Sequence, residues 1–439
     1  MKNTVKNFMF YIAFVASLGG LLFGFDTAVI SGAEKSIQTV YGLSDFSHGF
    51  TIAIALIGTI IGAFICSKPV EKYGRLKALK IIAFLYFVSA VGSAAIIDWY
   101  SFLFFRFAGG LAVGASSVVG PMYIAEISPS RWRGRFVAFF QFNIVLGIVL
   151  AYFSNYWIHG IPHDWQWMLG VEAIPAIVFA LLLYTVPESP RWLVKQNKET
   201  EARRIIKEVS NADIEQEVHE IRESLVATGN CGEKLFQRKY RKPILYAFLI
   251  ATFNQLSGIN AILYYAPRIF EMSGVFTNSA MMQSIVIGLT NLTFTMIGMI
   301  LIDQVGRKKL LYIGSIGMAI SLALVAKGFC QDTFSGYYML ACLMGFIAFF
   351  AISLGAVIWV LISEVFPNSV RSKGQVLGSM THWVWSALLS WMFPVFIRTG
   401  GTFIFSFFAI MMFLSFFFAL RLPETKNKSL EQIQKELTN

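Results

Sequence analysis

The stretch 8-FMFYIAFVASLGGLLFGF-25 decides the class of fold, because it holds no charged residue and about 20 apolar residues suffice to cross a bilayer as a helix. Similar runs recur along the chain, as in 403-FIFSFFAIMMFLSFFFAL-420. The 439 residues are 56% hydrophobic and 14% charged, whereas soluble proteins are about 25% charged. The first run is followed by many others, so it is a retained span rather than a signal peptide. The chain therefore crosses a membrane many times.

The net charge of +11 suggests a nucleic-acid partner at first, but the positions of the charges argue against one. Lysine and arginine gather in the segments 68–77, 131–135, 307–309 and 371–373, whereas an alternate loop such as 157–166 has none. This asymmetry is the positive-inside pattern of membrane proteins. The net positive charge thus reflects the orientation of the spans in the membrane. An even number of spans, with the basic loops on one side, then places both termini in the cytoplasm. The lipid bilayer, and no nucleic acid, is the expected surrounding.

The four cysteines show no metal-ligand or redox spacing, so we expect free thiols, no metal and no cofactor. The hydrophobic runs predict an all-α membrane protein with twelve transmembrane helices. The predicted spans are 8–30, 48–67, 78–97, 101–124, 135–157, 168–186, 243–268, 279–302, 309–327, 337–363, 372–396 and 402–421.

One long polar stretch, 195–242, separates two groups of six spans. Charges of both signs alternate along it, and apolar residues such as Ile205, Val209 and Val218 recur at helical spacing. This pattern predicts one or more amphipathic helices on the cytoplasmic surface, with a disordered linker as the alternative. The expected organisation is therefore a six-helix half over 1–194, a linker over 195–242, a second half over 243–423 and a cytoplasmic tail over 424–439.

The two halves resemble each other in three short segments. The loop 72-KYGRLK-77 recurs as 304-QVGRKK-309, 126-EISPSRWRG-134 as 364-EVFPNSVRSKG-374, and 187-PESPRW-192 as 423-PETKNK-428. The three pairs are separated by 232 to 238 residues and occur in the same order. Two six-span repeats are typical of secondary transporters, whose substrate site lies between the repeats near the middle of the bilayer.

These motifs, which extend over nearly the whole chain, carry a resemblance to a known family. The sequence resembles the sugar porters of the major facilitator superfamily, and in particular the bacterial proton-coupled monosaccharide symporters. The segments that carry the resemblance are 18-LGGLLFGFDTAVISG-32, 106-RFAGGLAVG-114, 121-PMYIAEISPSRWRG-134, 187-PESPRWL-193, 255-QLSGINAILYYAP-267, 303-DQVGRKK-309, 359-WVLISEVFPNSVR-371 and 423-PET-425. The resemblance implies a monomer in the bacterial inner membrane that transports a hexose or pentose with protons by alternating access.

Asp26, Arg106 and Glu172 are ionisable residues inside apolar spans, where a charge costs roughly 2.5–3.5 kcal/mol and should be paired or functional. A fixed Asp26–Arg106 pair that locks two helices is one interpretation. The resemblance favours the other, in which Asp26 matches the coupling carboxylate of the proton symporters. Protonation of Asp26 would then release Arg106 toward Glu172.

The expected sugar site combines amides with aromatic rings. Amide side chains both donate and accept hydrogen bonds, as sugar hydroxyls require, and an aromatic face covers the apolar C–H surface. Hydrogen bonding between helices is the alternative use of such amides. The resemblance, together with the amides of span seven, implies these contacts: Gln141, Asn254, Gln255, Asn260, Tyr264, Asn291, Gly355, Trp359, His382 and Trp383.

The charged motifs at the cytoplasmic ends of the spans are expected to control alternating access, or else to set topology alone. Glu126 is expected to pair with Arg131 and Arg133, and Glu364 with Arg371, with Arg75 and Arg307 completing a latch. Single surface pairs contribute only about 0–1 kcal/mol, so a latch must act as a network.

His382, Asn254 and Ile148 depart from the residues usual in the family, and they leave the identity of the sugar open. A facilitative uniporter is the nearest alternative, against which Asp26 argues. A sensor that binds sugar without transport is less consistent with the short tail. An enzyme is not expected, because the sequence has no phosphate loop, nucleophile–base signature or metal cluster.

Overall fold

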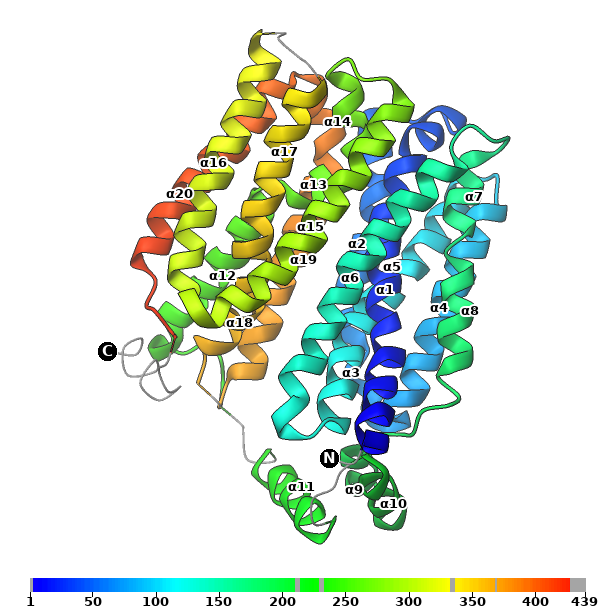
Figure 1. Ribbon diagram of the computed structural model, residues 1–439, viewed down its shortest axis with the longest axis vertical. Coiled ribbons are helices and arrows are strands. Elements are labelled where there is room, and N and C mark those ends of the chain that lie inside the picture. Colours follow the sequence, from blue (N-terminus) through cyan, green and yellow to red (C-terminus); the bar gives the residue numbers. More distant parts are fainter. Residues whose placement is uncertain (1–2, 210–213, 229–232, 332–335, 368, 427–439) are drawn as a thin grey trace. The chain divides into compact units, whose positions relative to one another are not determined.

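The computed structural model describes residues 3–209, 214–228, 233–331, 336–367 and 369–426. In these residues the regular secondary structure is helical, with no strand, as expected where lipid cannot hydrogen-bond to exposed backbone groups (Figure 1). Twelve helical segments of the described chain are long and apolar enough to span a membrane, which confirms the predicted number.

Nine predicted spans are single helices. Eight of them have ends that differ from the prediction by a few residues, and α1 extends ten residues beyond its predicted end. The nine are α1 (Asn3–Val40), α2 (Asp45–Ile65), α4 (Arg75–Ala95), α5 (Trp99–Ile127), α6 (Ser130–Ile158), α15 (Thr277–Val305), α16 (Arg307–Gln331), α19 (Arg371–Arg398) and α20 (Gly401–Arg421).

The other three spans are interrupted. The sixth divides into α7 (Asp164–Gly170) and α8 (Ala173–Leu182), the seventh into α12 (Arg241–Leu256), α13 (Ile259–Tyr264) and α14 (Ala266–Met272), and the tenth into α17 (Gly336–Phe350), a π-helical segment η2 (Ala351–Gly355) and α18 (Ala356–Glu364). Gly258 precedes α13 with φ +84°, and a Cβ there would lie 2.5 Å from the ring of Phe408. Gly258 therefore marks the first break in the seventh span.

Short helices occupy the polar segments. The predicted amphipathic linker contains α10 (Glu199–Val209) and α11 (Ile214–Thr228), which follow α9 (Pro190–Lys195), and η1 (Arg238–Tyr240) precedes α12. Helices α9, α10 and α11 share a small apolar core, which consists of Leu193, Val194, Ala202, Ile206 and Val218. Helix α3 (Ser67–Tyr73) joins α2 to α4.

The chain packs as two compact units. Unit 1 takes in the described residues of Met1–Val29, Ile57–Ala151 and Pro162–Cys231, and unit 2 those of Ile30–Leu56, Tyr152–Ile161 and Gly232–Asn439. One end of α1, of α2 and of α6 therefore packs with the helices of the second repeat. The units differ in this respect from the two halves expected from the sequence.

Small residues bring helices of unit 1 into close contact, as is common in membranes. A Cβ on Gly24 would lie 1.8 Å from the carbonyl oxygen of Ile144, and one on Gly147 would lie 2.1 Å from that of Leu21, so α1 and α6 cross backbone to backbone. This crossing helps to fix the part of α1 that carries Asp26.

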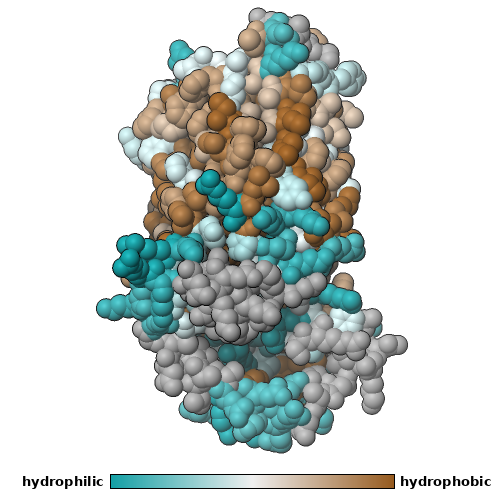
Figure 2. Space-filling model, turned by 90° about the vertical axis from the view of Figure 1, so that its left-hand side faces the viewer, coloured by the Kyte–Doolittle hydropathy of each residue, from teal (hydrophilic) through white to brown (hydrophobic). Residues whose placement is uncertain are grey.

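Unit 2 presents an apolar face where α16 and α20 lie side by side (Figure 1). Its exposed side chains include Ile313, Ile316, Phe403, Ile410 and Phe413. The apolar band in Figure 2 lies over this face, as a surface in contact with lipid requires.

Candidate functional site

Asp26 of α1 and Arg106 of α5 form a buried ion pair in unit 1. Arg106 Nη1 donates to Asp26 Oδ1 at 2.6 Å, and the residues are 2% and 4% exposed. Glu172, also 2% exposed, interacts with both residues from the break between α7 and α8. Two carboxylates that share one arginine leave a net negative charge in a dry environment, which a single proton neutralises.

Unit 2 contains a network of amides around the break in the seventh span. Gln255 Nε2 donates to Asn254 Oδ1 at 3.1 Å, and Asn260 Nδ2 donates to Gln255 Oε1 at 3.0 Å. Asn260 Nδ2 also lies 2.6 Å from Ser386 Oγ on α19. The broken helix thus presents three side-chain amides as one connected group.

His382 of α19 joins this network. Gln255 Nε2 lies 3.2 Å from Nδ1 and 3.1 Å from Nε2 of His382. An amide N–H donates, so the ring nitrogen that accepts carries no proton. The His382 ring packs against those of Trp359 and Trp383, with centroids 5.0 and 4.9 Å away.

The π-helical segment η2 is attached to the same network, because Asn254 Nδ2 donates to the carbonyl oxygen of Leu354 at 3.2 Å. Gly355 is the next residue and ends η2. Single π-turns inside α-helices are frequent at functional sites. Trp359 follows on α18 and is 40% exposed, in contrast to the buried amides.

Three further predicted sugar contacts are distributed over both units. Tyr264 is buried at the end of α13, and Asn291 accepts a hydrogen bond from Thr295 within α15 at 3.3 Å. Gln141 is half-buried on α6 and belongs to unit 1, whereas the other nine belong to unit 2.

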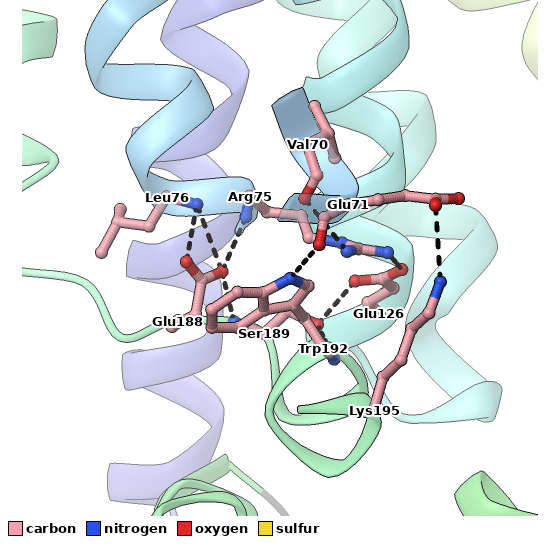
Figure 3. A network of polar contacts seen from close by, with 9 residues as sticks. All are labelled: Val70, Glu71, Arg75, Leu76, Glu126, Glu188, Ser189, Trp192 and Lys195. Carbon is pink, nitrogen blue, oxygen red and sulfur yellow. Dashed lines mark hydrogen bonds and ion pairs between the residues drawn. The ribbon is translucent and has the colours of Figure 1, made fainter. Parts of the chain in front are cut away.

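Arg75 is the centre of a polar network in unit 1 (Figure 3). Arg75 Nη2 lies 2.7 Å from Glu126 Oε1, and Ser189 Oγ donates to Glu126 Oε2 at 2.5 Å. Glu188 accepts from the backbone N–H groups of Arg75 and Leu76, and therefore caps the N-terminus of α4. Burial raises the pKa of Glu188, and these backbone donors oppose that change.

Unit 2 repeats this network with the corresponding residues. Arg307 Nη2 lies 3.1 Å from Glu364 Oε1, and Thr425 Oγ1 donates to Glu364 Oε2 at 2.6 Å. Glu424 accepts from the backbone N–H of Arg307 at 3.1 Å, as Glu188 does from that of Arg75. The internal duplication inferred from three short motifs is therefore reproduced contact by contact.

The partners differ from those expected at the helix ends. Glu126 pairs with Arg75 rather than with Arg133, which is exposed, and the side chain of Arg131 lies outside the described residues. Arg371 Nε donates to the carbonyl oxygen of Phe366 at 3.4 Å, and Glu364 pairs with Arg307. The sequence shows which residues are charged, but pairing depends on which helix ends meet.

Glu188 and Glu424 are not among the partners expected from the sequence, although both lie in the repeated segments 187-PES-189 and 423-PET-425. The buried residues Glu34 and His48 are not among the expected site residues either. An acidic residue in a predicted loop, or four residues past a predicted span, gives no signal of burial.

Twelve spans, a duplicated architecture, a buried Asp–Arg pair and a separate amide site define a multi-pass membrane transporter of the major facilitator class. A family model described as "Sugar (and other) transporter" matches residues 12–437, and the chain belongs to that family.

Relatives with known names support the assignment over the full length. The arabinose-proton symporter of Bacillus subtilis (strain 168) is 37% identical over 445 residues, which cover 99% of this chain and 96% of that protein. The D-xylose-proton symporter of Escherichia coli (strain K12) is 37% identical over 478 residues, covering 98% and 96%. The inward-open xylose transporter XylE from E. coli matches with a TM-score of 0.87 and 36% identity over 98% of this chain and 100% of that chain.

Proposed function

We propose that this protein carries a monosaccharide together with protons across the membrane by alternating access, and that a pentose is its substrate. The observation that carries the proposal is the buried Asp26–Arg106 pair with Glu172 beside it. A buried carboxylate with one cation and a competing carboxylate can take up or release a proton as its surroundings change. Two relatives at 37% identity are named for arabinose and xylose, which supports a pentose.

The proton role belongs to Asp26. In its ionised form Asp26 accepts from Arg106, which holds α1 against α5. A proton on Asp26 removes the negative charge, and Arg106 then has Glu172 as its remaining carboxylate partner. The change of partner favours a different packing of these helices, which is how a proton gradient drives transport.

The sugar site is the amide network with its aromatic rings. Gln255, Asn260 and His382 supply the polar contacts, and Trp359 covers the apolar side of the sugar ring. Asn254 fixes the π-helical segment beside Gly355, where a ligand can approach the backbone. Gln141, Tyr264, Asn291 and Trp383 complete the proposed set.

The networks of Arg75 and Arg307 stabilise the cytoplasmic ends of the two repeats. We propose that the protein is a monomer in the inner membrane of a bacterium. Both termini are placed in the cytoplasm, because the positive-inside rule assigns the basic loops to that side. The end of unit 2 that holds Glu34 and His48 then faces the exterior.

The test is uptake into proteoliposomes of the purified protein. Radiolabelled D-xylose and L-arabinose are supplied with and without an imposed proton gradient, and D-glucose is added as a competitor. We expect uphill accumulation of a pentose only with the gradient. Asp26→Asn should abolish accumulation and preserve exchange of sugar across the membrane, because the variant keeps the site but cannot titrate.

Accumulation by Asp26→Asn equal to that of the unchanged protein would remove Asp26 from the coupling mechanism. Uptake that only equilibrates in the unchanged protein would identify a uniporter. Binding without any flux would identify a sensor.

A further inference from the structure

A buried acid and a buried histidine lie together at the proposed external end of unit 2. Glu34 of α1 is 2% exposed and His48 of α2 is fully buried. Glu34 Oε2 lies 2.6 Å from His48 Nε2. Neither residue takes part in the Asp26 cluster or the amide network, so the proposed transport mechanism leaves this pair without a role.

A third residue competes for the same carboxylate oxygen. Arg268 of α14 approaches Glu34 Oε2 with Nη1 at 3.2 Å and also donates to Gln38 Oε1 at 3.1 Å. Glu34 therefore has two partners that can carry positive charge. One is on α2, joined to α1 by a short turn, and the other is on α14 of the second repeat.

Each carboxylate near the pair has one cationic partner, so no additional positive charge on His48 is needed for neutrality. Asp45 pairs with Arg398 at 3.0 Å and Glu271 pairs with Lys35 at 2.8 Å, just as Glu34 pairs with Arg268. Other titratable groups in this part of unit 2 include Tyr265, whose ring centroid lies 6.2 Å from that of His48, and the half-buried His159, which follows the end of α6. While Arg268 is in place, His48 is best accommodated as a neutral ring.

The geometry indicates where a further proton would bind. A neutral His48 donates from Nε2 to Glu34, which leaves Nδ1 as the basic atom. His48 Nδ1 is buried and has no hydrogen-bond partner among the described residues. It is therefore a vacant proton acceptor next to a carboxylate.

The contacts that bury this pair belong to a closed interface between α1 and α2 on one side and α14 and α19 on the other. Trp391 of α19 donates from Nε1 to the carbonyl oxygen of Phe46 at 3.1 Å, and its ring packs against Phe46 and Phe50. A Cβ on Gly49 would lie 1.8 Å from the Trp391 carbonyl oxygen, so α2 and α19 touch through their backbones. Separation of these elements would remove Arg268 from Glu34 and would admit water to His48.

We propose that Glu34 and His48 form a second proton-binding site, which fills when Arg268 withdraws and empties when Arg268 returns. The proton passes from external water to His48 Nδ1, where an N–H bond forms, and the imidazolium replaces Arg268 as the cation beside Glu34. Closure reverses the step. The inference rests on the proposed function, because it assumes that this end of unit 2 opens to the exterior. Binding of the proton to His48 then makes low external pH favour the open state.

The test measures opening directly and uses no sugar. Ser31 lies one turn before Glu34 on the same face of α1 and is 2% exposed. The four native cysteines are replaced by serine and Ser31→Cys is introduced. Intact cells are then treated with a membrane-impermeant thiol reagent at external values of about pH 5.5 and about pH 8, on either side of the ordinary histidine range.

His48→Gln in the same background is the reference, because glutamine can still donate to Glu34 but cannot become charged. We expect the labelling rate of the His48 protein, divided by that of His48→Gln at the same pH, to rise several-fold at the lower pH. The division removes the pH dependence of the thiol itself.

Two further variants distinguish the buried pair from its surroundings. Glu34→Gln should also abolish the pH dependence, because nothing then favours a charged His48. Lys35→Gln breaks an exposed ion pair on the same helix and should preserve the dependence. Equal pH dependence with and without His48 would overturn the second proton site, whatever the result of the uptake experiment.

Discussion

At the scale of single residues, His382 contacts both the amides and the aromatic rings of the proposed sugar site. Its ring accepts from Gln255, packs against Trp359 and meets Trp383 edge to face. Gln255 in turn connects Asn254 with Asn260. The imidazole therefore orients an amide that the proposed substrate needs, in addition to any contact it makes itself.

We predict that His382→Leu lowers sugar affinity and that His382→Gln largely restores it. Leucine removes the acceptor of the buried Gln255 N–H, and an unsatisfied buried group costs about 1–3 kcal/mol. Glutamine supplies a carbonyl oxygen in its place. Titration calorimetry with D-xylose or L-arabinose measures the affinities. A leucine variant that binds as tightly as the original would show that the hydrogen bond does not matter.

At the scale of elements, the two repeats share one contact. In each repeat, a glutamate that follows the last span caps the start of an earlier helix. Gly74 precedes α4 with φ +94° and Gly306 precedes α16 with φ +99°. A Cβ at these positions would lie 2.3 Å from Glu188 Oε2 and 2.7 Å from Glu424 Oε2. Each glycine thus allows a glutamate to cap the helix that follows.

We predict that Gly74→Ala and Gly306→Ala destabilise the protein to a similar extent. The backbone conformation disfavours any side chain by about 1–3 kcal/mol, and the methyl group also displaces the capping carboxylate. Thermal unfolding of the purified protein in detergent is the measurement. Gly134→Ala is the control, because Gly134 lies in α6 with nothing within 4 Å of the added Cβ. An unchanged midpoint for both variants would contradict the capping role.

At the scale of the whole molecule, the proposed proton site and most of the proposed sugar site lie in different units. Asp26, Arg106 and Glu172 belong to unit 1, and the amide network belongs to unit 2. Coupling between them must then pass through the change in packing that alternating access entails. Direct contact between proton carrier and amide network is not required.

We predict that substitutions in the two units separate binding from coupling. Gln255→Ala should weaken sugar binding by roughly tenfold or more, since partner groups in a buried network lose about 1–3 kcal/mol. Asp26→Asn should bind sugar almost normally and fail only in accumulation. Calorimetry and proteoliposome uptake measure the two properties.

Trp385→Phe is a matched control for Gln255→Ala, because it breaks another hydrogen bond between α19 and α12, from Trp385 Nε1 to Thr252 Oγ1 at 3.1 Å. It should leave affinity unchanged. Equal loss of binding in Asp26→Asn and Gln255→Ala would show that the two sites are not separable.

The twelve spans, the duplication and the residue types of the proposed sites could be predicted from the amino-acid sequence alone. Apolar runs and isolated polar residues are local properties, visible along a few consecutive residues. The predicted amides also proved to be connected where they lie on one broken helix, as Asn254, Gln255 and Asn260 do.

The pairing of the charged residues depends on the tertiary structure. Arg75 pairs with Glu126 and binds Glu188 through its backbone, while Glu34 is shared by His48 and Arg268, which lies 234 residues away in the chain. Such pairing depends on which helix ends pack together, and spacing along the sequence does not encode it. The same reason explains why part of α1 and α2 packs with the second repeat and buries a histidine that the sequence shows merely as a residue near a turn.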